Sequence, residues 1–166
     1  MRNKVYKLKY HILTDSEKRE ICSWTYYDDY AVYNLPSYEV MKEKQIGFFN
    51  PAHEQNYRAF YDGDCLVGFV NIKEEETRVF IGIGVKPELC SRGYGQHILH
   101  ETYLISKELY PNKPLCLEVR TWNERAIRCY QKSGFEIDGE PFEQKTGSGV
   151  GTFYRMVKAY AGNGEK

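Results

Sequence analysis

The 166-residue chain lacks several features that assign a protein to a class at once. No apolar run approaches the roughly 18 residues that a membrane-spanning helix needs, so no membrane span is predicted. The 23 basic and 23 acidic residues cancel, whereas nucleic-acid-binding proteins typically show a basic excess. The first residues carry charges but no continuous apolar stretch, which argues against a secretory signal. We therefore expect neither nucleic acid nor a membrane as a partner.

Cysteines are few and widely spaced, at positions 22, 65, 90, 116 and 129. They form no Cys-x-x-Cys pair and no dense framework, so we expect reduced thiols in a cytoplasmic protein. No arrangement of His and Asp residues suggests a cysteine nucleophile. His97 and His100 could face one side of a helix, but no third ligand lies nearby in the sequence, so no metal site is predicted.

Two common nucleotide-binding motifs are also missing. Gly82-Ile-Gly84 and Gly93-Tyr-Gly95 both lack the third glycine of the dinucleotide fingerprint G-x-G-x-x-G. The tripeptide G-K-[ST] of the P-loop does not occur. These absences disfavour a nucleotide-binding protein of either type.

Hydrophobic periodicity and turn signals predict the secondary structure. Strands are expected over 5–13, 56–61, 65–73, 77–85, 115–120, 135–139 and 151–160, and helices from Thr14, over 36–44, over 94–109 and over 123–133. Thr14 and Glu17 match a capping box, Asp62–Gly63 is a hairpin turn signal, and Gly134 suits the end of a helix. The stretch 143–151 is predicted to be a flexible loop, and 161–166 a frayed end.

This order of elements predicts an α+β protein (α/β in looser usage). The strand–helix–strand unit over 77–120 implies a parallel crossover inside a mixed sheet. We expect one domain, 1–166, with about six to seven strands and about four helices.

Gly93 and Gly95 lie where the strand 77–85 gives way to the helix 94–109. A helix N-terminus offers unpaired N–H donors and about half a positive charge, so it binds phosphates where side chains do not obstruct it. Arg92 adds a cation at the same place. The alternative is a tight turn with close packing of helix on strand, and this stretch alone leaves both open.

Two longer motifs resemble those of the GCN5-related N-acetyltransferases (GNAT). Asn123, Ala126, Tyr130, Gly134 and Phe135 match the family pattern N-x-x-A-x-x-x-Y-x-x-x-G-F after a strand. The stretch 85–99 resembles the acetyl-CoA motif V-x-P followed by [RQ]-x-x-G-x-[GA], through Val85, Pro87, Gly93 and Gly95. Cys90 departs from that motif, because Arg or Gln is usual there. The resemblance spans roughly residues 57–157 and implies the GNAT fold.

The resemblance implies that acetyl-CoA is the cofactor. Backbone N–H groups of residues 91–96 would wrap the pyrophosphate, and the backbone of the strand end at 83–85 would pair with the pantetheine arm. An N–H near Val85 would polarise the thioester carbonyl. The residues implied to contact acetyl-CoA are Ile83, Gly84, Val85, Cys90, Ser91, Arg92, Gly93, Tyr94, Gly95, Gln96, Asn123 and Tyr130.

The resemblance also assigns two catalytic roles. Tyr130 is the expected acid that protonates the departing thiolate, although a tyrosine at helical spacing also suits mere packing. Glu118 is the expected base, since an amine with a pKa of about 10 must lose a proton before it attacks. Its alternative is a solvated glutamate at the rim of a sheet. Asn123 would cap a helix and also bond the cofactor.

The sequence therefore predicts direct transfer of acetyl from acetyl-CoA to a primary amine. A catalytically silent acetyl-CoA-binding sensor is the alternative. The motif Leu117-Glu118-Val119-Arg120 is shared with the ribosomal-protein alanine acetyltransferases and points to protein N-terminal amines, while small-molecule amines remain equally open. The segment 24–30 suits either an acceptor pocket or a core cover, and exposed strand edges are compatible with a homodimer.

Overall fold

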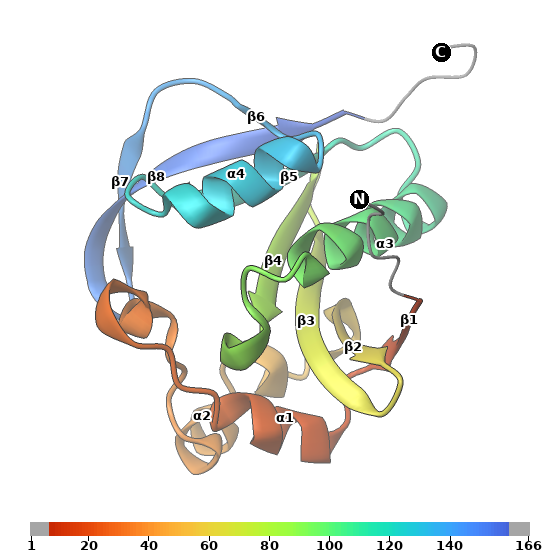
Figure 1. Cartoon of the computed structure of the whole chain (residues 1–166), viewed down its shortest axis with the longest axis vertical. Coiled ribbons are helices and arrows are strands. Elements are labelled where there is room, and N and C mark those ends of the chain that lie inside the picture. Colours follow the sequence, from red (N-terminus) through yellow and green to blue (C-terminus); the bar gives the residue numbers. More distant parts are fainter. Residues whose placement is uncertain (1–6, 160–166) are drawn as a thin grey trace. The chain divides into compact units, whose positions relative to one another are not determined.

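A computed structural model describes residues 7–159 of the chain (Figure 1). It divides into two compact units, which we call unit 1 (Met1–Asn71 and Ile83–Ile98) and unit 2 (Ile72–Gly82 and Leu99–Lys166). Three elements run through both units: β3 (Cys65–Glu74), β4 (Val79–Val85) and α3 (Tyr94–Leu109). No described helix is long and apolar enough to cross a membrane. The prediction of a single 1–166 domain stays a prediction.

Hydrogen bonds order the strands β1-β2-β3-β4-β5-β8-β6, and β7 also pairs with β8. The β4–β5 pairing is parallel, whereas β1–β2, β2–β3 and the pairings of β8 are antiparallel. This mixed sheet with helices confirms the α+β class. It has eight strands, one more than the seven that the sequence pattern defines.

Unit 1 contains an antiparallel meander and the first helices. β1 (Leu8–Ile12) pairs with β2 (Tyr57–Asp62), and β2 pairs with β3 across the turn at Gly63, whose φ is 60°. Between β1 and β2 lie α1 (Asp15–Cys22), α2 (Tyr38–Lys44) and the 3-10 helices Asp28–Tyr33 (η1), Gly47–Phe49 (η2) and Glu54–Asn56 (η3). These elements cover a core of Leu13, Ile21, Trp24, Met41, Phe48, Ala59 and Leu66. Burying each large apolar side chain contributes about 1.5–3 kcal/mol.

The start of α1 is fixed by the expected capping box. The Thr14 hydroxyl accepts from the Glu17 N–H at 3.3 Å, and the Glu17 carboxylate accepts from the Thr14 N–H at 2.8 Å. Glu17 is buried and also accepts hydrogen bonds from Tyr61 and His11. Burial alone would raise the pKa of Glu17, but these hydrogen bonds outweigh it and hold the pKa below its usual value. Burial, and after it the hydrogen bond to Glu17, raises the pKa of Tyr61 to about 12.

Unit 2 is built on β5 (Leu115–Arg120), which lies between β4 and the long strand β8 (Gly149–Lys158). α4 (Glu124–Lys132) follows β5, and Gly134, two residues after its end, adopts a φ of 95°, the left-handed conformation that commonly ends a helix. The short strand β6 (Glu136–Ile137) and the strand β7 (Phe142–Thr146) both pair with β8. In Figure 1 β7 and β8 form the blue hairpin.

The predicted loop over 143–151 is wrong. Most of it forms the β7–β8 hairpin, in which Thr146 pairs with Gly149 across Gly147-Ser148. Three glycines suggested flexibility, yet Gly-Ser between two alternating segments is itself a hairpin signal. In β7 half-buried residues alternate with the exposed Glu143 and Lys145. The expected first strand, 5–13, is described only from residue 7, and the stretch 161–166 lies outside the described residues.

Candidate functional site

The junction of β4 and α3 in unit 1 holds ten of the residues predicted to contact the cofactor. Ile83, Gly84 and Val85 end β4, residues 90–93 form the turn, and residues 94–96 begin α3. Gly93 has φ of 88°, a left-handed conformation that favours glycine, and Ser91 has φ of 65°. The first turn of α3 contains no acidic residue. The N–H groups at the start of α3 therefore face no competing carboxylate from the helix itself, which suits an anion.

Gly95 has an ordinary helical place as the second residue of α3. Its backbone conformation does not require glycine, in contrast to Gly93. Tyr94 is buried beside it and donates its hydroxyl to the Asp62 carboxylate at 2.6 Å. This hydrogen bond connects the first residue of α3 to the last residue of β2 and so fixes the start of the helix.

The end of β4 is held through the carbonyl of Val85. The Tyr26 hydroxyl donates to this carbonyl at 2.6 Å, and the Cys90 thiol lies 3.8 Å from the same oxygen and 3.7 Å from the Lys86 carbonyl. Cys90, which replaces the usual Arg or Gln, therefore turns its side chain back onto the strand end. The ladder between β4 and β5 covers Val79↔Leu115 and Phe80↔Cys116, although β4 continues to Val85.

Close packing against β3 explains why residue 84 is a glycine. A Cβ at this position would collide with the ring of Phe69. A Cβ at Gly68 on β3 would lie 2.6 Å from the Gly84 carbonyl oxygen. Without a side chain, Gly84 leaves room for the Phe69 ring, and Gly68 leaves room for the backbone of β4.

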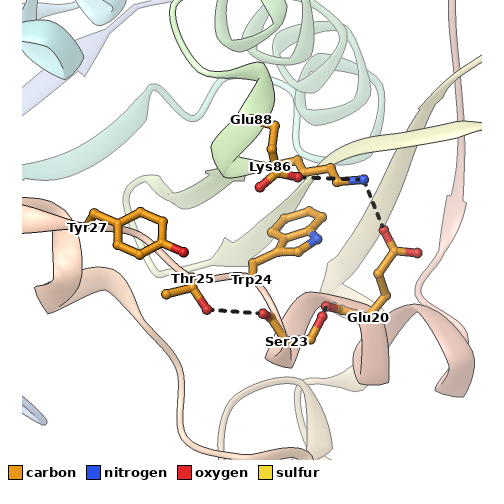
Figure 2. A pocket seen from close by; sticks show the side chains of 7 residues that line it. All are labelled: Glu20, Ser23, Trp24, Thr25, Tyr27, Lys86 and Glu88. Carbon is orange, nitrogen blue, oxygen red and sulfur yellow. Dashed lines mark hydrogen bonds and ion pairs between the residues drawn. The ribbon is translucent and has the colours of Figure 1, made fainter.

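A pocket of about 450 Å³ lies in unit 1, at the end of α1 and just after β4 (Figure 2). Its lining residues are Glu20, Ser23, Trp24, Thr25, Tyr27, Lys86 and Glu88. The Lys86 ammonium lies 3.9 Å from Glu20 and 4.0 Å from Glu88. The Trp24 indole N–H is buried and has no hydrogen-bond partner among the described residues. Three residues of the segment 24–30 thus line a pocket, but Asp28 and Asp29 do not.

Glu118 occupies the middle of β5 in unit 2. Its carboxylate accepts from the Gln144 amide of β7 at 3.0 Å and from the Arg155 guanidinium of β8 at 3.3 Å. The side chain is 15% exposed, so Glu118 is not the solvated rim residue of the alternative interpretation. A carboxylate offers about four lone-pair sites, so capacity to accept a proton remains beyond these two bonds.

Asn123 and Tyr130 lie on the helix that follows β5. The Asn123 side chain accepts from the Ala126 N–H at 3.1 Å and so caps α4, as predicted. Tyr130 is half-buried near the end of α4, and its ring meets Phe135 edge-on with centroids 6.3 Å apart. The structure thus places Glu118 on a strand and Tyr130 on the next helix of the same unit.

Sequence reasoning missed the partners of the predicted residues. Gln144 and Arg155 lie 26 and 37 positions from Glu118, and Tyr26 lies 59 positions from Val85. Because the segment was predicted to be a loop, the pairing of β7 with β8 was not predicted. That pairing brings Gln144 close to Glu118. A correct hairpin assignment at Gly147-Ser148 would have placed Gln144 on a strand beside the expected strand 151–160, which already contains Arg155.

Residues 17–135 match the model of the acetyltransferase (GNAT) family. An uncharacterized N-acetyltransferase of Bacillus subtilis, YfmK, is 33% identical over 91 residues, which cover 50% of this chain and 56% of that protein. An N-alpha-acetyltransferase of Sulfurisphaera tokodaii is 30% identical over 110 residues, which cover 62% of this chain and 66% of that protein. These alignments span between about half and two thirds of the relatives' lengths.

Solved structures share the fold. A chimera of the Vibrio cholerae spermidine N-acetyltransferase SpeG with hSSAT superposes with a TM-score of 0.70 at 18% identity, covering 91% of this chain and 95% of that one. At this identity the likeness concerns the fold alone. Together with the strand–turn–helix geometry around Gly93, the family match shows that the chain belongs to the acetyltransferase (GNAT) family.

Proposed function

We propose that this protein is an N-acetyltransferase that transfers the acetyl group of acetyl-CoA directly to a primary amine. One observation carries the proposal: β4 leads through the left-handed Gly93 into an α3 whose first turn is free of acidic residues. This arrangement favours the binding of an anionic phosphate ligand. The family match over residues 17–135 makes an acyl-CoA the expected source of that phosphate.

The chain's own residues take separate roles in this reaction. Acetyl-CoA, when bound, supplies an activated acetyl thioester. The N–H groups of residues 91–96 hold its pyrophosphate, and the short β4–β5 ladder supports backbone contacts from Ile83 and Val85 to the pantetheine arm. Glu118 takes a proton from the attacking amine as the N–C bond forms. The Tyr130 hydroxyl gives a proton to the thiolate as the C–S bond breaks.

The proposal also covers the acceptor amine, the cellular compartment and the oligomeric state. The Sulfurisphaera relative is named an N-alpha-acetyltransferase, which supports a protein N-terminal amine, whereas the Vibrio neighbour is named for spermidine. All five cysteines are free thiols, which supports a reducing cytoplasmic compartment. β1, at one end of the strand order, supports a homodimer through strand pairing.

Acetyl-CoA is expected to raise the melting temperature of the protein, because it binds the folded state preferentially. NAD and ATP, tested at the same concentration by differential scanning fluorimetry, should raise it far less. Thiol release from acetyl-CoA with a mixture of amines then separates an enzyme from a silent acetyl-CoA sensor. Equal stabilisation by NAD would refute the cofactor assignment, and stabilisation without thiol release would favour the sensor.

Gly95→Asp is expected to move stability and cofactor binding in opposite directions. An acidic residue in the first turn of a helix stabilises it by about 0.3–1 kcal/mol. The same carboxylate stands among the N–H groups proposed to bind pyrophosphate, so acetyl-CoA binding should weaken by ~1–3 kcal/mol. Calorimetric titration and chemical denaturation measure the two effects.

Gly95→Ala is the matched control for that variant. Gly95 lies in α3 without a positive φ, so alanine fits the backbone there and adds no charge. A loss of acetyl-CoA affinity in Gly95→Asp, together with a smaller loss in Gly95→Ala, supports a charge effect. Unchanged affinity in both variants would show that α3 does not begin at the phosphate site.

A further inference from the structure

One face of the β5–β8–β7 sheet in unit 2 carries a cluster of charged, polar and aromatic side chains, which we call the arginine face. It consists of Glu118, Arg120, Phe142, Gln144, Phe153 and Arg155. Glu118 pairs in register with Arg155, and Arg120 pairs with Phe153. Residues paired in register point to the same side of a sheet. Glu118, the proposed base, therefore lies beside two arginines.

Both guanidinium groups are held by aromatic rings. Arg120 lies over Phe153 with its Cζ 4.9 Å from the ring centroid, and Arg155 lies over Phe142 at 5.2 Å. The two rings stack on each other with centroids 6.1 Å apart. A Cβ at position 151 would collide with Arg120 Nη1, so Gly151 leaves the space that this buried guanidinium fills. The arginines are thus fixed in position by the fold.

Few of the hydrogen-bond donors on these two arginines bond to other residues in the described part of the chain. Among the described residues, Arg120 donates to the Thr146 hydroxyl at 3.2 Å, and Arg155 donates to Glu118 at 3.3 Å. A guanidinium carries five N–H donors. The Nε of Arg155 is buried and has no partner among the described residues. A buried donor without a partner is uncommon in a folded protein. The Arg155 side chain as a whole is 34% exposed, so an oxygen acceptor from outside would approach the Nη donors and not the buried Nε.

The charge of the arginine face points to the same kind of ligand. Two guanidinium groups and one carboxylate leave a net positive charge next to Glu118. A planar guanidinium fork matches a carboxylate, which can accept two parallel N–H bonds. A polyamine offers several cations and no oxygen, so it would meet like charge and leave these donors unpaired.

We propose that the acceptor of this enzyme carries a carboxylate close to its reactive amine, with the amine at Glu118 and the carboxylate on Arg155. This inference rests on the proposed acetyl transfer and narrows its acceptor class. It favours amino acids, or peptides with an acidic side chain near the N-terminus, over polyamines. Arg120 adds positive charge from the same face, and Phe142 and Phe153 keep the two guanidinium planes in place.

The test compares matched acceptors that differ in one carboxylate. The pairs are alanine with alaninamide, and the amidated tripeptides Ala-Asp-Ala with Ala-Asn-Ala; spermidine is assayed alongside. All are measured at equal concentrations of unprotonated amine. In at least one pair the carboxylate member should show a kcat/KM about 10- to 100-fold above its amide partner, the range for hydrogen bonds to a charged group. Spermidine should fall below the preferred acceptor.

Variants of Arg155 show whether that preference comes from its guanidinium. Arg155→Gln should abolish the difference between pair members by slowing the carboxylate acceptor, and Arg155→Lys, which keeps the charge but not the fork, should restore part of it. Arg128→Gln is the control, because Arg128 lies on α4 with a side chain 65% exposed and should keep the preference.

Two kinds of failure are distinguishable. An equal fall for both members of a pair in Arg155→Gln would show that Arg155 acts only through Glu118, and would overturn the inference. Faster acetylation of spermidine than of every carboxylate acceptor would also overturn it, while leaving the acetyltransferase intact. Absence of acetyl transfer to every amine, in a protein that acetyl-CoA does not stabilise, would refute the proposed function and this inference with it.

Discussion

Replacing Tyr130 by phenylalanine is expected to lower the maximal rate of acetyl transfer by about 10²–10⁴-fold, the contribution of a general acid. Such a loss corresponds to roughly 3–5 kcal/mol of transition-state stabilisation. Phenylalanine keeps the edge-on contact with Phe135, so α4 and its packing should survive. Only the hydroxyl proposed to protonate the thiolate disappears. Steady-state kinetics at saturating acetyl-CoA and acceptor give the rate, and calorimetry gives the acetyl-CoA affinity.

Tyr110→Phe is the control for the loss of a tyrosine hydroxyl. Tyr110 directly follows α3 and lies outside the proposed site. Its variant should keep the turnover of the native protein. A Tyr130→Phe enzyme with native turnover would return Tyr130 to a packing role, and a Tyr130→Phe protein that no longer binds acetyl-CoA would make the hydroxyl a binding group.

Local signals made much of the fold predictable. The helix expected over 94–109 is α3 with the same bounds, and the strand expected over 115–120 is β5. The capping box at Thr14 and the left-handed Gly134 were likewise readable, because a cap depends on residues only a few positions apart. Signals of this range specify where an element starts and ends.

Long-range contacts were not predictable in the same way. The bonds from Gln144 and Arg155 to Glu118 require the register of β7, β8 and β5, which the sequence pattern does not state. A strand register is decided by which faces are buried and by the turn that joins two strands. Once β7 was taken for a loop, the neighbourhood of Glu118 could not be constructed.

The contacts of Cys90 explain how a cysteine fits where the acetyl-CoA motif usually has Arg or Gln. Arg or Gln at this position would extend a polar side chain, whereas the Cys90 thiol contacts the carbonyls of Val85 and Lys86. The thiol and the Tyr26 hydroxyl share the Val85 carbonyl oxygen as acceptor. The short Cys90 side chain thus packs against the end of β4 through these two carbonyl contacts.

Replacing Glu118 by glutamine is expected to lower kcat/KM by about 10²–10⁴-fold near neutral pH, where the acceptor amine is mostly protonated. Glutamine keeps the shape of the side chain but cannot take the proton. The loss should shrink as the pH approaches the pKa of the amine, because free amine then needs no base. The Tyr130→Phe defect should persist at alkaline pH, so pH–rate profiles of the two variants distinguish the base from the acid.

Glu118→Gln also disturbs its neighbours, so it needs a structural control. The new amide can still accept from one donor, but its NH₂ group would face either Gln144 or Arg155, which are donors themselves. Gln144→Leu removes one of those donors while the carboxylate stays in place. It should cost far less activity than Glu118→Gln, and its loss should not vary with pH. If the Glu118→Gln defect is equally flat with pH, Glu118 positions the acceptor and does not act as the base.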